Sequence, residues 1–212
     1  MTNRLIPLSL ASVLMLLGAY SYASAGSVKQ LRDSMLNKNL AAFGRVLDSG
    51  AIGLSDFESD PDLYELACVS TYETYAPFFD ALLDYGVNPS LEDPEKSVQA
   101  FSLLVCARRS MNVEAFKKLL DAGARTEILL CESCPSISQE PLVQRVISEP
   151  EMFLEIVKRR ELTNTELLAI SVSVSRVYYH KTFNDQPLNE FYADYLRERG
   201  IDVTPKGPYK PE

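Results

Sequence analysis

The amino-acid sequence predicts an all-α protein, a helical-hairpin solenoid of about five repeats. Three observations favour this fold. A helical pattern that ends in an acidic residue and then a glycine recurs, and its glycines Gly50, Gly86 and Gly123 lie 36 and 37 residues apart. A second, shorter apolar segment precedes each such pattern. A period of about 20 to 50 residues is typical of solenoids, in which helix pairs stack because none can bury its apolar face alone.

Residues 1–25 have the composition of a cleaved signal peptide. Arg4 precedes an uncharged apolar stretch, and Ala23-Ser24-Ala25 places small residues where a signal peptidase requires them. The stretch is short for a membrane span, which needs about 20 apolar residues, so a retained anchor helix is the alternative. Cleavage after Ala25 predicts export. The short leader is typical of bacteria, and we therefore expect a periplasmic location with no stable membrane anchor after cleavage.

The second helix of each repeat carries the clearest pattern. In three copies, at 40–51, 78–87 and 112–124, an acidic residue follows the apolar positions and Gly follows two residues later. Gly at that place predicts a left-handed residue that ends the helix. A fourth copy at 156–161 has Arg160 in place of Gly, and a fifth at 195–202 restores it as Gly200. We expect these apolar positions to form the core: Leu47, Leu82, Leu83, Leu119, Leu120, Ile156, Val157 and Leu196.

The first helix of each repeat is predicted from the shorter apolar segments. These segments cover 28–36, 63–69, 100–107, 141–147 and 166–174. Pairing them with the second helices predicts one domain over 26–204, followed by a disordered tail over 205–212. The repeats then run approximately over 27–51, 62–87, 99–124, 140–161 and 165–201.

The repeat resembles the ankyrin-repeat family, most closely in its third copy. Ser102-Leu103-Leu104 stands where the family has Thr-Pro-Leu, Ala107 matches a helical Ala, and 113–124 follows the second-helix half of the motif. The resemblance covers 27–202. The Thr-Pro-Leu-His signature is never intact, and the spacing of 36 to 40 residues exceeds the usual 33 or so, which leaves other helical-hairpin solenoids as alternatives. The resemblance implies a scaffold whose concave face and loops bind a protein.

The sequence offers little from which to build a catalytic site. His180 is the single histidine, so neither a multi-histidine zinc site nor a pair of imidazoles for acid and base catalysis is available. No phosphate-binding glycine loop, dinucleotide fingerprint or nucleophile elbow occurs. The net charge of −8 disfavours nucleic acid as a partner. We therefore predict no enzyme activity, no metal and no cofactor.

The four cysteines fall into two pairs. Cys131 and Cys134 form a C-x-x-C in a long loop, which predicts a structural disulfide, with a redox dithiol as the alternative. Cys68 and Cys106 occupy matching places in successive first helices. Helix axes lie about 8 to 10 Å apart, whereas a disulfide needs Cα atoms within about 7 Å. A bond between them and two buried thiols both remain open.

Acidic loops between repeats are the predicted partner-binding surface. In an ankyrin stack the inter-repeat loops project side by side, so the two acidic loops, 55–62 and 88–95, would form one negative patch that attracts a basic partner. Ordinary solubilising charge is the alternative. Nearby aromatic residues would anchor the interface, and Tyr178, Tyr179 and Phe183 would do so at the other end. The predicted residues are Asp56, Phe57, Glu58, Asp60, Asp62, Tyr72, Tyr75, Glu92, Asp93 and Glu95.

Together these features predict a periplasmic protein-binding module that is a monomer when free. The sharpest hypothesis is an immunity protein that binds and neutralises a toxin effector delivered to the periplasm, such as a type VI secretion lipase. Two alternatives come from other classes. One is an accessory in oxidative-stress protection that uses Cys131 and Cys134, and the other is an unrecognised hydrolase.

Overall fold

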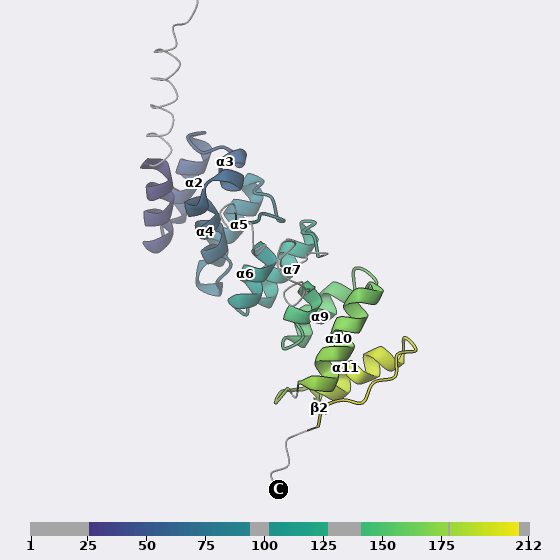
Figure 1. The fold of residues 1–212 in the computed structure, drawn as a ribbon. Coiled ribbons are helices and arrows are strands. Elements are labelled where there is room, and N and C mark those ends of the chain that lie inside the picture. Colours follow the sequence, from purple (N-terminus) through teal and green to yellow (C-terminus); the bar gives the residue numbers. More distant parts are fainter. Residues whose placement is uncertain (1–25, 94–101, 127–140, 178, 208–212) are drawn as a thin grey trace, which may run out of the picture.

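The structure is a computed structural model that describes residues 26–93, 102–126, 141–177 and 179–207. Within these ranges the regular structure is helical apart from one short strand pair, which confirms the all-α class. Figure 1 shows the helices following one another in chain order along an elongated body. No helix of the described ranges is long and apolar enough to cross a bilayer. The predicted signal peptide lies outside the described residues.

The helices match the predicted segments in number and order, with α3 and a 3-10 turn in addition. The first helices are residues 26–36, α4 (Pro61–Ser70), α6 (Leu103–Arg109), α8 (Leu142–Arg145) and α10 (Asn164–Arg176). The second helices are α2 (Leu40–Asp48), α5 (Ala76–Tyr85), α7 (Val113–Asp121), α9 (Pro150–Val157) and α11 (Leu188–Arg197). The additional elements are α3 (Leu54–Ser59) and η1 (Glu73–Tyr75).

Helices of the same kind pack against one another along the body. The first helix α4 packs on α6, and α8 packs on α10. The second helix α2 packs on α5, and α7 packs on α9. Each of the pairs α4–α5, α6–α7 and α10–α11 also packs as a hairpin. The predicted core leucines and isoleucine of the second helices are buried between these rows, while Leu83 and Val157 are half-buried against them.

Bonds between residues far apart in the sequence span about one repeat. The disulfide between Cys68 and Cys106 joins residues 38 positions apart. The same separation of 38 residues recurs in the ion pair of Lys118 with Asp80. Successive repeats are therefore fastened to each other at equivalent points, as a stack requires. Further bonds of this kind join Tyr85 to Ile52, Asn112 to Thr71, Arg125 to Ser90 and Arg159 to Asp121.

Left-handed residues end the second helices as predicted. Gly50, Gly86, Gly123 and Gly200 have φ angles of 69°, 100°, 89° and 76°. Gly86 has the most positive φ, and a Cβ there would also lie 3.5 Å from Leu54. Arg160, which stands in place of the expected glycine, does not adopt a left-handed conformation. The chain therefore leaves α9 by a different turn.

A second left-handed turn, not predicted from the sequence, connects the two helices within a repeat. Lys38 and Met111 have φ angles of 54° and 53°. Each directly precedes an asparagine, Asn39 or Asn112, whose side chain accepts a hydrogen bond from the first turn of the following helix. The N-cap and the preceding left-handed residue thus reverse the chain within three residues, 37–39 and 110–112.

The C-terminal repeat contains the strand pair. Strand β1 (Thr182–Phe183) pairs antiparallel with β2 (Gln186–Pro187). Asn184 and Asp185 connect them with φ angles of 51° and 63°, both positive as in a type I′ hairpin turn. Beyond α11 the chain returns to α10, where the Lys206 N–H donates to the Val174 carbonyl at 2.8 Å. The prediction that a disordered tail starts at residue 205 is therefore wrong in its starting point, because this hydrogen bond holds Lys206 against α10.

Candidate functional site

Three successive connections between repeats lie side by side and form what we call the loop edge. The first loop covers residues 50–60 and includes the short helix α3, the second covers 86–93 and the third covers 123–126. The Asn88 amide donates to the Glu58 carboxylate at 3.4 Å, which joins the first loop to the second, and the hydroxyl of Tyr85, the last residue of α5, donates to the Ile52 carbonyl at 2.6 Å. The Arg125 N–H donates to the Ser90 hydroxyl at 2.9 Å, which joins the second to the third. The side-by-side arrangement expected for these loops is therefore present in the described ranges.

The loop edge contains a small open pocket of about 200 Å³. Buried Leu91 contributes an apolar wall, and the other lining groups are polar. Arg125 pairs with Glu92 at 3.2 Å, whereas Glu58 accepts a weak hydrogen bond of 3.4 Å from the Asn88 amide. The pocket therefore has one carboxylate more than it has cations. Its lining residues are Glu58, Asn88, Ser90, Leu91, Glu92 and Arg125.

Two of these lining residues, Glu58 and Glu92, were predicted from the acidic loops, and the others were not. Arg125 directly follows the Gly123-Ala124 that ends the third copy of the helical pattern. This position, at the start of the third loop, is the sequence signal that could have identified Arg125 as part of the loop edge. Asn88 and Ser90 lie in the second acidic loop, where their small polar side chains carry no charge to mark them.

Several predicted partner-binding acids instead hold the chain together. Asp56 accepts the Gly53 N–H at 2.7 Å within the first turn of α3, and Asp60 caps α4 by accepting the Asp62 N–H at 2.8 Å. Asp62 pairs with Arg32 of the preceding repeat at 2.9 Å. The expectation that 55–62 is an irregular loop is wrong, because α3 occupies most of it and α4 begins at Pro61.

The predicted aromatic anchors differ in accessibility. Phe57 is 1% exposed, so its predicted role in partner contact is wrong. It lies on the inner face of α3, where it joins the core. Tyr75 is half-buried with its ring against Phe78, at 6.3 Å between centroids. Tyr72 is 48% exposed and remains available to a partner.

The other predicted positions are less informative. Asp93 is half-buried at the end of the second loop, and Glu95, Cys131, Cys134 and Tyr178 lie outside the described residues. At the C-terminal end, Tyr179 and Phe183 pack partly against the core. His180 is exposed. Within the described ranges, no group of three or more His, Cys, Asp or Glu side chains is placed to hold a metal ion.

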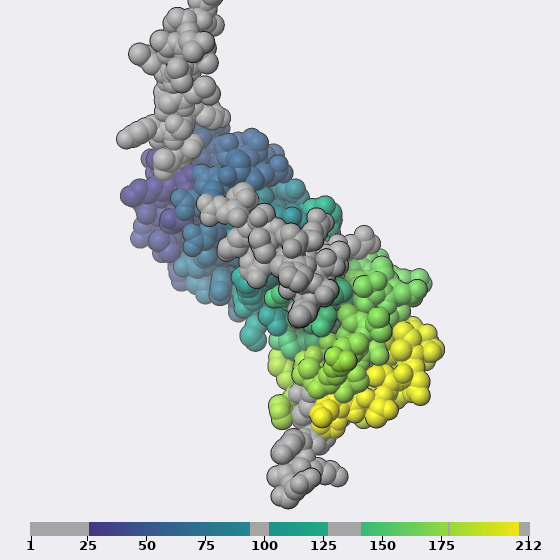
Figure 2. Space-filling view, in the orientation of Figure 1, coloured from purple at the N-terminus to yellow at the C-terminus, as the bar shows by residue number. Residues whose placement is uncertain are grey.

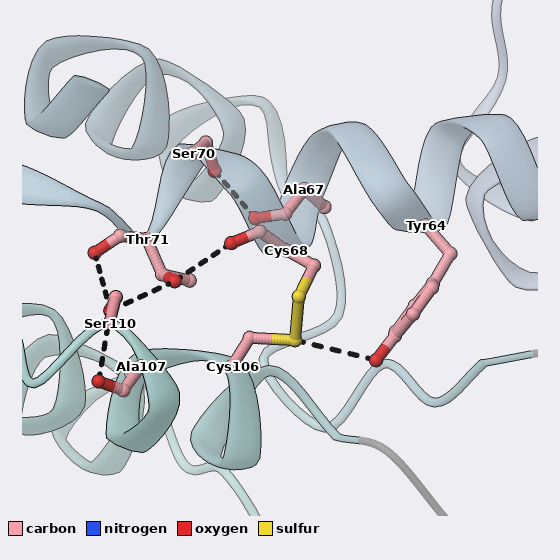
Figure 3. Close-up of a disulfide and its surroundings, with 8 residues drawn as sticks. All are labelled: Tyr64, Ala67, Cys68, Ser70, Thr71, Cys106, Ala107 and Ser110. Carbon is pink, nitrogen blue, oxygen red and sulfur yellow. Dashed lines mark hydrogen bonds between the residues drawn. A yellow bond between two sulfur atoms is a disulfide. The ribbon is translucent and has the colours of Figure 1, made fainter. Parts of the chain in front are cut away.

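A disulfide between Cys68 of α4 and Cys106 of α6 resolves the pairing that the sequence left open (Figure 3). The Cα atoms are 5.3 Å apart, within the range that a disulfide requires. Ala67 precedes Cys68 and Ala107 follows Cys106, and these short side chains are buried in the same region. Small residues beside both sulfurs allow the two first helices to approach closely.

Polar side chains flank the disulfide on both sides. The Tyr64 hydroxyl lies 3.4 Å from the Cys106 Sγ. Burial, with a smaller contribution from the charge of Asp93, raises the pKa of Tyr64 above its ordinary value, so the hydroxyl keeps its proton. On the other side the Ser110 hydroxyl donates to the Thr71 carbonyl at 3.2 Å. The second and third repeats are thus joined by a covalent bond flanked by hydrogen bonds.

No protein-family model matches the chain, and neither curated proteins nor solved structures match it. The described residues define an all-α protein in which neighbouring helices pack against one another and three loops form an acidic edge.

Proposed function

We propose that the chain is a protein-binding module of ankyrin-like repeats that uses the loop edge to bind a partner with a basic surface. The observation that carries this proposal is the convergence of three loops on a pocket where no cation of the described residues lies beside Glu58. Disulfide and hydrogen bonds between repeats support a rigid platform. Rigidity favours binding because less conformational entropy is lost when the partner docks.

We further propose that the protein acts in the periplasm. The signal-peptide composition of residues 1–25 predicts export. The Cys68–Cys106 disulfide supports the same compartment, because disulfides persist in oxidising environments and are rare in the bacterial cytosol.

The specific role that we propose is that of an immunity protein, which binds and neutralises a toxin effector delivered to the periplasm, such as a lipase. A protein of net charge −8 with an acidic edge would attract a basic effector and speed its association. Fast capture suits a role in which the toxin must be bound before it acts. Blocking a toxin needs no catalytic group on the immunity protein, and the sequence predicts none.

Affinity capture tests this function. The tagged chain is recovered from periplasmic extract, bound proteins are identified by mass spectrometry, and the affinity of the isolated pair is measured by calorimetry. We expect a one-to-one complex with the product of a neighbouring gene. Glu58→Lys should weaken binding by roughly tenfold or more, because it places a cation opposite a basic partner.

Glu198→Lys provides the matched control, because it makes the same charge change on an exposed residue at the opposite end of the body. This variant should bind as the wild type does. Equal affinities of the two variants would contradict the role of the loop edge. Failure of any neighbouring-gene product to bind would contradict the immunity role.

A further inference from the structure

Helix α10 presents an apolar face to solvent. Leu168 is 64% exposed and Val172 is 37% exposed. Residues four apart lie on the same side of a helix, so the two side chains are neighbours. On the opposite side Ile170 and Val174 are fully buried in the core. Helix α10 is therefore apolar on two faces, and the described structure covers one of them. Figure 1 labels α10 in the C-terminal part of the body, and Figure 2 shows the green segment that contains it at the surface.

The outward face of α10 has no charge along its length. Thr165, Leu168, Val172 and Ser175 follow one another along its exposed side, while charged residues make up 24% of the chain as a whole. Solvated helices usually carry charge on this side. An uncharged face with small residues at both ends permits close approach of another helix.

Opposite charges stand at the two ends of this face. Glu161 lies just before α10 and Arg176 is its last residue, and both are exposed. Neither side chain forms an ion pair within the described ranges. Their separation is about the length of the helix, roughly 20 Å for 13 residues.

We infer that α10 docks antiparallel against α10 of a second copy of the chain. A two-fold axis near the middle of the helix places Leu168 opposite Val172 of the partner subunit. The same axis brings Arg176 toward Glu161 of the partner subunit. At the other end of the contact it brings Glu161 toward Arg176 of the partner subunit. An isologous contact must be self-complementary, and an apolar centre between opposite charges meets that requirement.

The contact forms a weak dimer. One helix pair buries less than the roughly 1,200–2,000 Å² of a stable interface. The chain is then a monomer when dilute, as the sequence predicts, and a dimer at high concentration. This inference does not depend on the proposed function, because the loop edge belongs to other repeats.

Sedimentation velocity of the processed chain from about 1 µM to about 1 mM tests the inference, since a weak contact has a dissociation constant within this range. The weight-average mass should rise toward that of a dimer at the upper end. Leu168→Ser/Val172→Ser should keep the mass monomeric. Met111→Ser changes another exposed apolar residue, 62% exposed in a turn between α6 and α7, and should leave the rise unchanged.

A charge exchange tests the orientation. Glu161→Arg alone and Arg176→Glu alone should each weaken the dimer, because both place like charges together. The double variant Glu161→Arg/Arg176→Glu should restore it, since opposite charges face each other again. Circular dichroism checks that every variant remains folded.

A wild-type chain that stays monomeric throughout would overturn the inference, as would a dimer that survives Leu168→Ser/Val172→Ser. If the wild type stays monomeric and that double variant instead loses the neighbouring-gene partner, the face belongs to the partner interface and self-association is excluded. Loss of partner binding through Glu58→Lys leaves the dimer test unaffected.

Discussion

Arg160 binds Glu166 through both terminal nitrogens of its guanidinium, at 2.8 and 2.6 Å. Glu166 is 4% exposed and lies in the first turn of α10. The Nε of Arg160 donates to the Thr126 hydroxyl in the third loop. The residue that replaces the expected glycine therefore joins the third repeat to the fifth.

Arg160→Met should destabilise the protein by about 3 kcal/mol, because it leaves the Glu166 carboxylate buried without its cation. Urea unfolding followed by circular dichroism measures the loss. In the double variant with Glu166→Gln the cost should be smaller than the sum of the single costs, since the two groups interact. Arg197→Met removes an exposed cation that pairs with Asp194, and should cost less than about 1 kcal/mol. Equal losses for Arg160→Met and Arg197→Met would contradict the importance of the buried pair.

Stability should fall in acid partly through Glu166. Burial alone would raise the pKa of Glu166, but hydrogen bonds from Arg160 and Thr163 outweigh burial and hold the pKa below its ordinary value. The folded state therefore gains stability above the usual glutamate pKa of about 4.3 and loses it as the pH falls through the lower, folded-state pKa.

Melting temperatures measured from pH 7 to pH 3 test this dependence. Glu166→Gln should lower the melting temperature at pH 7 and reduce the further decrease in acid. Some decrease should remain, because hydrogen bonds from Lys158 and Arg159 also lower the pKa of Glu155. A variant with the same acid dependence as the wild type would exclude Glu166 as a contributor.

The inter-repeat disulfide should stabilise the fold by about 4 kcal/mol, the chain-entropy estimate for its separation of 38 residues. The test compares Cys68→Ser/Cys106→Ser with its parent, both with Cys131 and Cys134 replaced by Ser. Dithiothreitol should lower the urea midpoint of the parent and leave that of the double variant unchanged. Peptide mapping without reductant should recover a peptide pair that contains Cys68 and Cys106. A parent insensitive to dithiothreitol would contradict the stabilising role.

Asn112 should contribute more to stability than Asn39, although both cap a second helix. Each accepts a hydrogen bond from the helix, at 3.0 Å, and Asn112 also donates to the Thr71 carbonyl of the preceding repeat at 2.8 Å. Aspartate keeps the cap and removes the amide donor. Asn112→Asp should therefore cost about 1 kcal/mol more than Asn39→Asp in urea unfolding. Equal costs would show that the bond to Thr71 adds nothing.

The candidate site was predicted in part, and its residues show why. Glu58 and Glu92 were expected from the acidic loops, and they converge because successive repeats stack. Phe57 was expected at the surface because its neighbours are charged. A helix as short as α3 has a weak sequence signal, so its inward face was missed. Arg125 was missed because a single cation in the sequence does not indicate a binding site. Its position beside Glu92 becomes known only from the tertiary structure.

By itself, the sequence determined the helix pairs, their order and the glycines that end them. These features depend on side-chain spacing and on backbone conformations that Gly adopts without strain, which are local properties. Tertiary structure decided the pairing of Cys68 with Cys106, the burial of Phe57 and the junction that Arg160 makes with Glu166. Each of these depends on how closely neighbouring repeats approach, and that distance is set by packing across about one repeat length of chain.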